Sequence, residues 1–234
     1  MDFAQVKDIK ITEGNVIKIV DSANRILWQK SSVTPTTKNV ILTFTSTADT
    51  TVNVYYTESS YNSSTPDMTI SLTANQKKTT DTGKEEIYKF TFTSPESITE
   101  AGVTGTLLTC KELFSSCMYL STLDLTKLNT SKVTDMSKMF YITYSLTSLD
   151  VSSWDTSNVT TMSSMFEGSW IQTLDVSAWN TNNVENMDNM FNGADKLTTI
   201  GAVDTASGWQ HKPNSFRGMF AWAMEISPKP SWWS

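Results

Sequence analysis

The chain has 234 residues, enough for one large domain or two to three small ones, and its 38% hydrophobic content suffices for a buried core. The formal net charge of −6 argues against a nucleic-acid partner, because such an interface needs clustered Lys and Arg to displace counterions. The N-terminal residues lack the pattern of a signal peptide, and no later stretch approaches the roughly eighteen apolar residues of a membrane helix. We therefore expect a soluble chain that the general secretory route does not export.

Two short runs of alternating apolar and polar residues open the chain. They are "VKDIKI" and "NVIKIVDSANRILWQ", and "DSAN" within the second has turn composition. This alternation predicts a small β-hairpin unit within residues 1–33. Residues 31–38, "SSVTPTTK", lose the alternation and are rich in Ser, Thr and Pro, which is typical of a linker.

Residues 34–100 form the second predicted unit. Four segments rich in β-branched and aromatic residues are separated by polar turn clusters: "NVILTFTS", "TVNVYYTE", "MTISLTA" and "EIYKFTFTS". Short strands at such regular spacing favour a small antiparallel β-sandwich.

Residues 101–234 repeat themselves. Phe114, Phe140, Phe166 and Phe191 are 26, 26 and 25 residues apart, and Leu123, Leu149, Leu174 and Ile200 keep the same period. Each unit opens with the period-two spacing of a strand, and apolar residues then recur at steps of three and four, as on one face of a short helix. A period of this length indicates stacked units that share one core. We expect a multidomain β plus α/β protein, in which a leucine-rich-repeat-like α/β solenoid with a C-terminal cap follows the β units.

The shared core is predicted to consist of repeated Leu, Met and Phe positions. Unbranched Met side chains fill gaps between imperfect repeats, so no cofactor is needed to explain them. The expected core residues are Leu123, Leu149, Leu174, Met136, Met139, Phe140, Met162, Met165, Phe166, Met187, Met190 and Phe191.

One face of the predicted strands is acidic and rich in hydroxyl groups. Its residues should point away from the core because each is offset by one or three positions from a buried Leu. They are Asp124, Asp150, Asp175, Thr122, Ser148, Thr173, Thr126, Ser152 and Ser177. Residues 105–200 hold five Lys against seven Asp and three Glu, a net charge of −5. Three interpretations stay open: a solvated face, a binding face for sugar hydroxyls or a basic protein patch, and a calcium site.

The C-terminal segment concentrates tryptophan. Trp209, Trp222, Trp232 and Trp233 either cap the last repeat or contact sugars or another subunit. Catalysis has little support, because the single histidine, His211, has no partner pattern for a nucleophile, a base or a metal. We expect neither an enzyme nor a metal cofactor.

Two of the repeats carry a resemblance to a known family. The strings "LDVSSWDTSNVTTMSSMF" (149–166) and "LDVSAWNTNNVENMDNMF" (174–191) closely resemble the repeats of BspA-like bacterial and mycoplasmal surface proteins, relatives of leucine-rich repeats. Leu128, Trp154 and Trp179 stand where leucine-rich repeats usually have Asn, so the usual Asn ladder is not expected. The resemblance implies a surface-displayed recognition or adhesion module without enzymatic chemistry.

The N-terminal segment carries a second resemblance. "VKDIKITEGNVIKIVDSANRILWQK" is similar to the start of structural proteins of bacteriophages that infect gut bacteria. It implies a virion fibre or decoration protein that attaches to other virion proteins through its N-terminal region and presents the repeats to a host-surface glycan or protein. Fibres are commonly trimeric, so a homo-oligomer is expected. The alternative is a fragment of a bacterial cell-surface adhesin.

Overall fold

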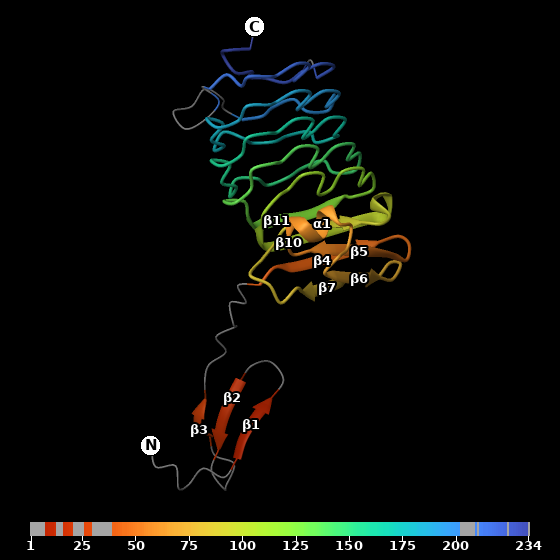
Figure 1. Cartoon of the computed structure of the whole chain (residues 1–234), viewed down its shortest axis with the longest axis vertical. Helices are drawn as coiled ribbons and strands as arrows, with labels where there is room; N and C mark the ends of the chain where they lie inside the picture. The colour runs from red at the N-terminus through yellow and green to blue at the C-terminus, as the bar shows by residue number, and fades with distance from the viewer. Residues whose placement is uncertain are drawn as a thin grey trace. The chain divides into compact units, whose positions relative to one another are not determined.

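A computed structural model describes residues 8–12, 16–20, 26–29, 39–201, 209, 211–223 and 225–233. The chain divides into two compact units, residues 1–38 and 39–234. In the first unit three strands form an antiparallel sheet in the order β1-β2-β3 (Figure 1): β1 (Asp8–Thr12), β2 (Val16–Val20) and β3 (Ile26–Gln29). The predicted turn at 21–24 and the predicted linker at 31–38 lie outside the described residues.

The second unit opens with two sheets, of order β11-β10-β4-β7 and β6-β5-β9, and β8 pairs with β10. Their strands are β4 (Ile41–Ser46), β5 (Thr50–Tyr55), β6 (Met68–Leu72), β7 (Lys78–Asp81), β8 (Glu86–Ile87), β9 (Lys89–Phe92), β10 (Ile98–Leu107) and β11 (Thr122–Asn129). Because β10 pairs antiparallel with β4 but parallel with β11, the larger sheet is mixed and not purely antiparallel as expected.

Helices are scarce. Over the described ranges they are limited to α1 (Glu58–Asn62) and the 3-10 helix η2 (Pro95–Ser97). Neither lies in the repeats. In the same part of the chain, no helix has the length and apolar character that a membrane crossing requires.

Aromatic side chains join the two sheets to the first coil of the repeats, the segment between β10 and β11 that contains Phe114. Phe44 meets Phe90 and Phe92 edge to face, with ring centroids 5.2 Å apart in both pairs. Phe90 in turn lies 5.8 Å from Phe114. The buried residues consequently form one cluster that runs from Val40 to Ile226.

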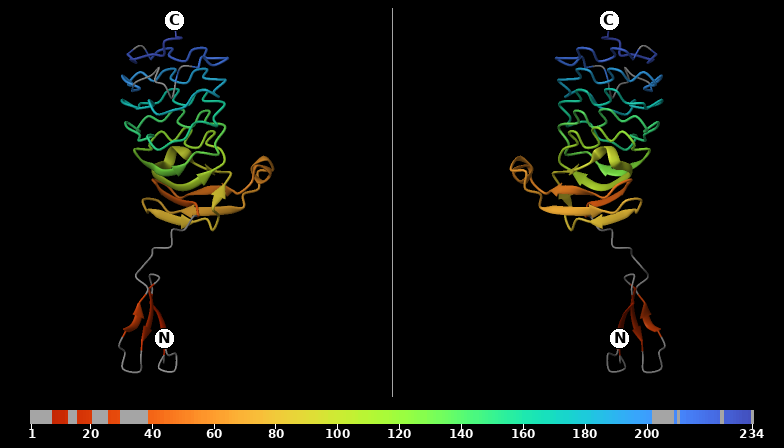
Figure 2. Two further views of the ribbon diagram at one scale, coloured as in Figure 1. Left: turned by 90° about the vertical axis from the view of Figure 1, so that its left-hand side faces the viewer. Right: turned by 90° about the vertical axis from the view of Figure 1, so that its right-hand side faces the viewer.

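After β11 the chain runs as irregular coils that lie one above another (Figures 1 and 2). Neighbouring coils meet at isolated parallel bridges in two series, Ser148–Thr173–Thr199 and Asp135–Thr161–Asn186–Ser215. The first series falls in the segments predicted to form one strand per repeat. Only the first of those segments is a full strand, β11.

The predicted helices of the repeats do not form. In each Met-Phe segment a tight turn closes instead, as where the amide of Met165 donates to the carbonyl of Met162 at 3.2 Å. The next amide, that of Phe166, donates to Met190 of the following coil at 2.8 Å. An α-helix keeps such bonds within itself, from each amide to the carbonyl four residues earlier. The predicted α/β solenoid is therefore wrong: the protein is nearly all β.

Left-handed residues explain why these turns do not continue into helices. Lys138, Ile142, Ser164 and Asn189 have φ between 55° and 57°, and Gly168 and Gly193 have φ of 66° and 68°. They recur about every fourth residue, at equivalent places in successive coils. Every residue of a right-handed helix has a negative φ, so a residue with positive φ ends the helix.

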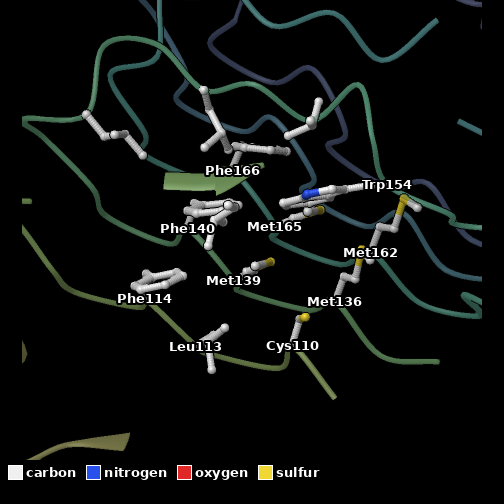
Figure 3. Close-up of a cluster of buried hydrophobic side chains, with 14 of the residues drawn as sticks. Cys110, Leu113, Phe114, Met136, Met139, Phe140, Trp154, Met162, Met165 and Phe166 are labelled. Atoms are coloured by element: carbon white, nitrogen blue, oxygen red, sulfur yellow. The ribbon is translucent and has the colours of Figure 1, made fainter. Parts of the chain in front are cut away.

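The Met and Phe columns nevertheless line the interior (Figure 3). All the Met and Phe residues proposed for the core are fully buried, Leu149 and Leu174 are 9% and 2% exposed, and Leu123 is half-buried. Phe114, Phe140, Phe166, Phe191 and Phe220 form a continuous ring stack with centroids 5.2–5.8 Å apart. Cys110 and Cys117 are free thiols in the same core, and burial raises the pKa of Cys110 to about 12.

Candidate functional site

The nine acidic and hydroxyl residues predicted for one face, here called the acidic strip, lie at the surface. All are exposed except Ser177, which is half-buried. Asp124 belongs to β11, while Asp150 and Asp175 follow the bridge residues Ser148 and Thr173 in the next two coils. Since coils in parallel pairing lie about 5 Å apart, Asp150 and Asp175 stand in a column, which Asp124 continues at the equivalent position of the repeat in β11.

Each carboxylate of the column is fixed by the residue two positions later. The Oδ1 atom of Asp124 accepts from the amide and the hydroxyl of Thr126 at 3.1 and 2.7 Å, and that of Asp150 accepts from the same groups of Ser152 at 3.0 and 2.7 Å. Asp175 accepts from the amide of Ser177 at 3.0 Å. These side-chain and backbone bonds hold the pKa of all three carboxyl groups below the ordinary value, so the strip stays ionised at neutral pH.

No ion pair neutralises the strip within the described residues. The pairs found there are Lys77–Glu100, Lys111–Asp135, Lys132–Glu86 and Lys196–Asp195. None involves a carboxylate of the strip.

A shallow groove of about 600 Å³ brings part of the strip together. It is lined by Asp150 and Asp175, by their hydroxyl neighbours Ser148 and Thr173, and by apolar residues between them. Thr122 and Asp124 instead line a separate depression of about 250 Å³. The lining of the groove does not include Thr126, Ser152 and Ser177, whose role is to orient the carboxylates.

Gly201 ends the strip, and the sequence reading missed it. It also lines the groove, with a φ of +77°, and a Cβ atom there would lie 2.1 Å from Oδ1 of Asp175. The signal was present, because Gly201 follows Ile200 as Asp175 follows Leu174. A fourth carboxylate would repel its neighbour, and glycine leaves the room that Asp175 occupies.

The interpretation of the strip as a calcium site has no support among the described residues. Where the structure describes the chain, it contains no group of three or more His, Cys, Asp or Glu residues placed to hold a metal ion. The strip carboxylates instead take their hydrogen bonds from the chain itself.

The four candidate tryptophans divide between core and surface. Trp209 is fully buried, and its Nε1 donates to the carbonyl of Val176 at 3.2 Å, so it belongs to the core and not to a contact surface. Trp232 and Trp233 are half-buried and meet Phe216 edge to face at 5.4 and 5.7 Å, as a cap does. Of the four, Trp222 alone is largely exposed, at 81%.

Further exposed aromatics stand on the coils, and the sequence reading did not single them out. Tyr144 and Trp170 are exposed, and their ring centroids lie 5.3 Å apart. Tyr119 is exposed one coil earlier. The repeat period was the available signal, since the three residues are spaced by 25 and 26.

Comparison with known proteins places the chain in one family. No curated protein and no solved structure matches it. Residues 108–233, which include all the coils after β11, match the family described as "Mycoplasma protein of unknown function, DUF285". Since this match covers more than half of its 234 residues, the chain belongs to the DUF285 family.

Proposed function

We propose that the chain is a non-enzymatic binding protein whose acidic strip recognises basic groups on a target surface. The supporting observation is that Asp124, Asp150 and Asp175 are exposed, ionised and oriented, yet take part in no ion pair within the described residues. Two like charges about 5 Å apart repel by about 0.8 kcal/mol even in water. A partner that supplies cations at the same spacing relieves this repulsion.

The biological setting that we propose is a virion, in which the chain serves as a fibre or decoration protein. The likeness of residues 1–30 to phage structural proteins supports attachment to other virion proteins through the N-terminal region. The likeness of the repeats to BspA-like proteins supports their display toward a host surface. A symmetric homo-oligomer, such as a trimer, would present several strips at once and strengthen weak individual contacts.

A bacterial cell-surface adhesin is the second candidate. It is favoured by the description of the matching family, which names Mycoplasma proteins. Both settings use the same recognition face, and they differ in where the protein accumulates. Mass spectrometry of particles released from the source strain, compared with its cell-envelope fraction, distinguishes them: enrichment in particles supports the virion, and enrichment in envelopes supports the adhesin.

Binding by the strip is tested with the full chain on immobilised polylysine and on intact host cells. Substituting Asp124→Asn, Asp150→Asn and Asp175→Asn together should weaken binding and flatten its dependence on salt up to about 1 M, where the screening length falls to about 3 Å. The matched control carries Glu85→Gln, Glu185→Gln and Glu225→Gln, which change the net charge equally at exposed positions outside the strip. Equal loss in both variants would reduce the effect to overall charge and refute a specific strip.

A further inference from the structure

A second pocket, of about 760 Å³, lies in the second unit, where the sheets meet the first coil. Four separate stretches of chain line it: residues 56–62 around α1, residues 86–88, residues 108–111 and residues 134–135. Its volume falls in the range of about 300–1,000 Å³ that is typical of small-molecule sites. It shares no lining residue with the groove of the acidic strip.

Tyrosine rings form much of its wall. Tyr56, Tyr61 and Tyr88 line the pocket and are half-buried. Tyr61 is held between Tyr55 and Tyr88, with ring centroids 5.3 and 5.7 Å away, and the hydroxyl of Tyr56 donates to the carbonyl of Thr82 at 3.2 Å. Because these rings are fixed before any ligand arrives, the pocket offers a preorganised apolar surface with polar edges.

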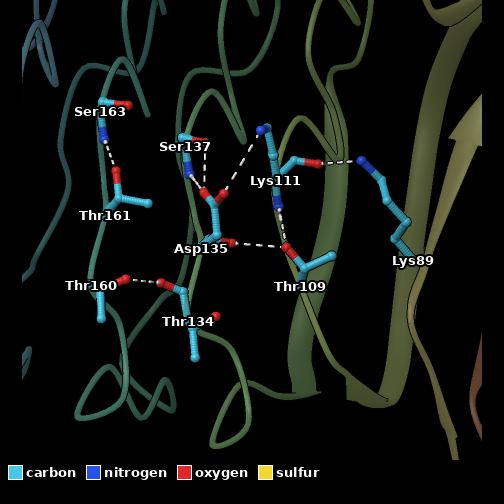
Figure 4. Close-up of polar contacts among 9 residues, drawn as sticks. All are labelled: Lys89, Thr109, Lys111, Thr134, Asp135, Ser137, Thr160, Thr161 and Ser163. Atoms are coloured by element: carbon cyan, nitrogen blue, oxygen red, sulfur yellow. Dashed lines mark hydrogen bonds and ion pairs between the residues drawn. The ribbon is translucent and has the colours of Figure 1, made fainter. Parts of the chain in front are cut away.

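A buried lysine fixes two walls relative to one another. The side chain of Lys89 is 1% exposed, and its Nζ atom donates to the carbonyl of Lys111 at 2.6 Å (Figure 4). The same ammonium group lies 4.7 Å from the centroid of the Tyr61 ring. Lys89 thus connects β9, the tyrosine wall and the first coil, and it is a positioning residue.

Two of the three carboxylates that line the pocket already have lysine partners. Glu86 pairs with Lys132, and Asp135 lies 4.0 Å from Nζ of Lys111 while it accepts two bonds from Ser137 (Figure 4). An incoming cation would compete with these lysines for the carboxylates. An incoming anion would meet Glu86 and Asp135, together with Glu58, which also lines the pocket. The pocket therefore suits a neutral ligand.

We propose that this pocket binds a neutral saccharide. A sugar ring has an apolar face of C–H groups, which packs against tyrosine rings, and a rim of hydroxyls, which bonds to polar side chains. Exposed side chains of this kind, Asn62 and Thr134, line the pocket beside the tyrosines. The site is distinct from the acidic strip, and its ligand class is different.

The test uses the full wild-type chain and a panel of neutral oligosaccharides, with binding followed by saturation-transfer NMR and calorimetry. We expect at least one member to bind. Tyr88→Ala should weaken its binding roughly tenfold or more, since it removes one aromatic wall. Asn62→Ala, at an exposed position that leaves the core intact, should also weaken binding. Tyr119→Ala is the matched control, because Tyr119 is an exposed tyrosine outside the pocket, and it should bind as the wild type does.

The result does not depend on the proposed function, because the strip variant with three Asp→Asn substitutions should keep full sugar affinity. Competition between a free oligosaccharide and the same glycan immobilised on beads shows whether the pocket takes free sugar or the end of a surface glycan. The proposal is overturned if no neutral sugar binds the wild-type chain at about the millimolar concentrations where weak sites saturate. It is equally overturned if hexylammonium or inorganic phosphate binds there in place of sugars, or if Tyr119→Ala weakens binding as much as the pocket variants.

Discussion

A single glycine controls where the acidic strip stops. Gly201 has a left-handed backbone, and the carboxylate of Asp175 occupies the space that a Cβ atom at residue 201 would need. Among the amino acids, glycine alone satisfies both conditions without strain. The strip is thereby limited to Asp124, Asp150 and Asp175, each oriented by a hydroxyl or amide two residues later.

Gly201→Ala should destabilise the protein by roughly 1 kcal/mol beyond the backbone cost, because the added methyl displaces the Asp175 carboxylate from its hydrogen bond with the amide of Ser177. Gly83→Ala is the control, since Gly83 has a similar φ of +69° but nothing within 4 Å of the added atom, and it should cost only about 1 kcal/mol. Urea unfolding measures both. Equal losses would show that backbone conformation alone requires glycine at residue 201.

Ser152→Ala should raise the pKa of Asp150 toward its ordinary value, because it removes the 2.7 Å hydroxyl bond that is the main cause of the lowered pKa. NMR titration of the Asp150 carboxyl measures this. Ser153→Ala is the control, because the Ser153 hydroxyl donates to the carbonyl of Thr126 and not to the carboxylate. A pKa of Asp150 that moves in neither variant, or equally in both, would contradict the role of Ser152.

The pH dependence of stability follows from the same bonds. A carboxyl group whose pKa is lower in the folded state than in the unfolded state stabilises the fold above the unfolded pKa of about 3.9. That stabilisation is lost as the pH falls through the lower folded pKa. Ser152→Ala should therefore cost stability at neutral pH and cost less in strong acid, as measured by urea unfolding at both pH values.

At the scale of elements, the spacing of the Met-Phe segments predicts correctly which side chains are buried but not which backbone conformation carries them. Spacing by three and four correctly indicates which side chains face inward, since Met162, Met165 and Phe166 are fully buried. It predicts the wrong backbone, because a run of tight turns with a left-handed residue every fourth position places side chains on the same side. Gly168 and Gly193 were the local signal of the left-handed positions, because glycine adopts positive φ without strain. The carbonyls of the neighbouring coil, which take the amides, are invisible to a local pattern.

Substitutions of Lys138 distinguish the observed turn from a helix, because the expected difference in stability between Gly and Ala has opposite signs in the two backbones. Its φ is 55°, so Lys138→Gly should be more stable than Lys138→Ala by about 1 kcal/mol, because glycine adopts this conformation without strain. In a helix the order would be reversed by a similar amount, about 1 kcal/mol. Both variants remove the side chain, which is exposed, so their difference in thermal unfolding reports the backbone.

At the scale of the molecule, the sheets and coils of residues 39–234 share one core. The repeat columns predicted its coil portion, but the link through Phe90 and Phe114 joins segments that no sequence period relates. The tyrosine pocket escaped prediction for the same reason, since its walls come from four stretches of chain that only the fold brings together.

This shared core predicts that sheets and coils unfold together. With Trp28→Phe, the remaining tryptophans all lie beyond residue 150. With Tyr119→Phe, Tyr141→Phe and Tyr144→Phe as well, the remaining tyrosines all belong to the sheet region: Tyr55, Tyr56, Tyr61 and Tyr88. Tryptophan and tyrosine fluorescence should therefore give the same midpoint in urea. Phe114→Ala, which removes the link between the regions, should separate the two midpoints, and separate midpoints in the parent chain would contradict a single cooperative unit.

The forward hydrogen bonding of the Met-Phe turns has a consequence for how such proteins diversify. Each coil donates amides to the carbonyls of the coil that follows it and offers its own equivalent carbonyls to the coil before it, as where the amide of Phe140 donates to Met165 and that of Phe166 to Met190. Duplication of one 25-residue unit ahead of Gly201 would be accommodated by the existing pattern and would add one carboxylate to the strip. The number of carboxylates on such a surface can therefore rise or fall one at a time, through gain or loss of whole repeats in the gene, while the packing of the core stays the same.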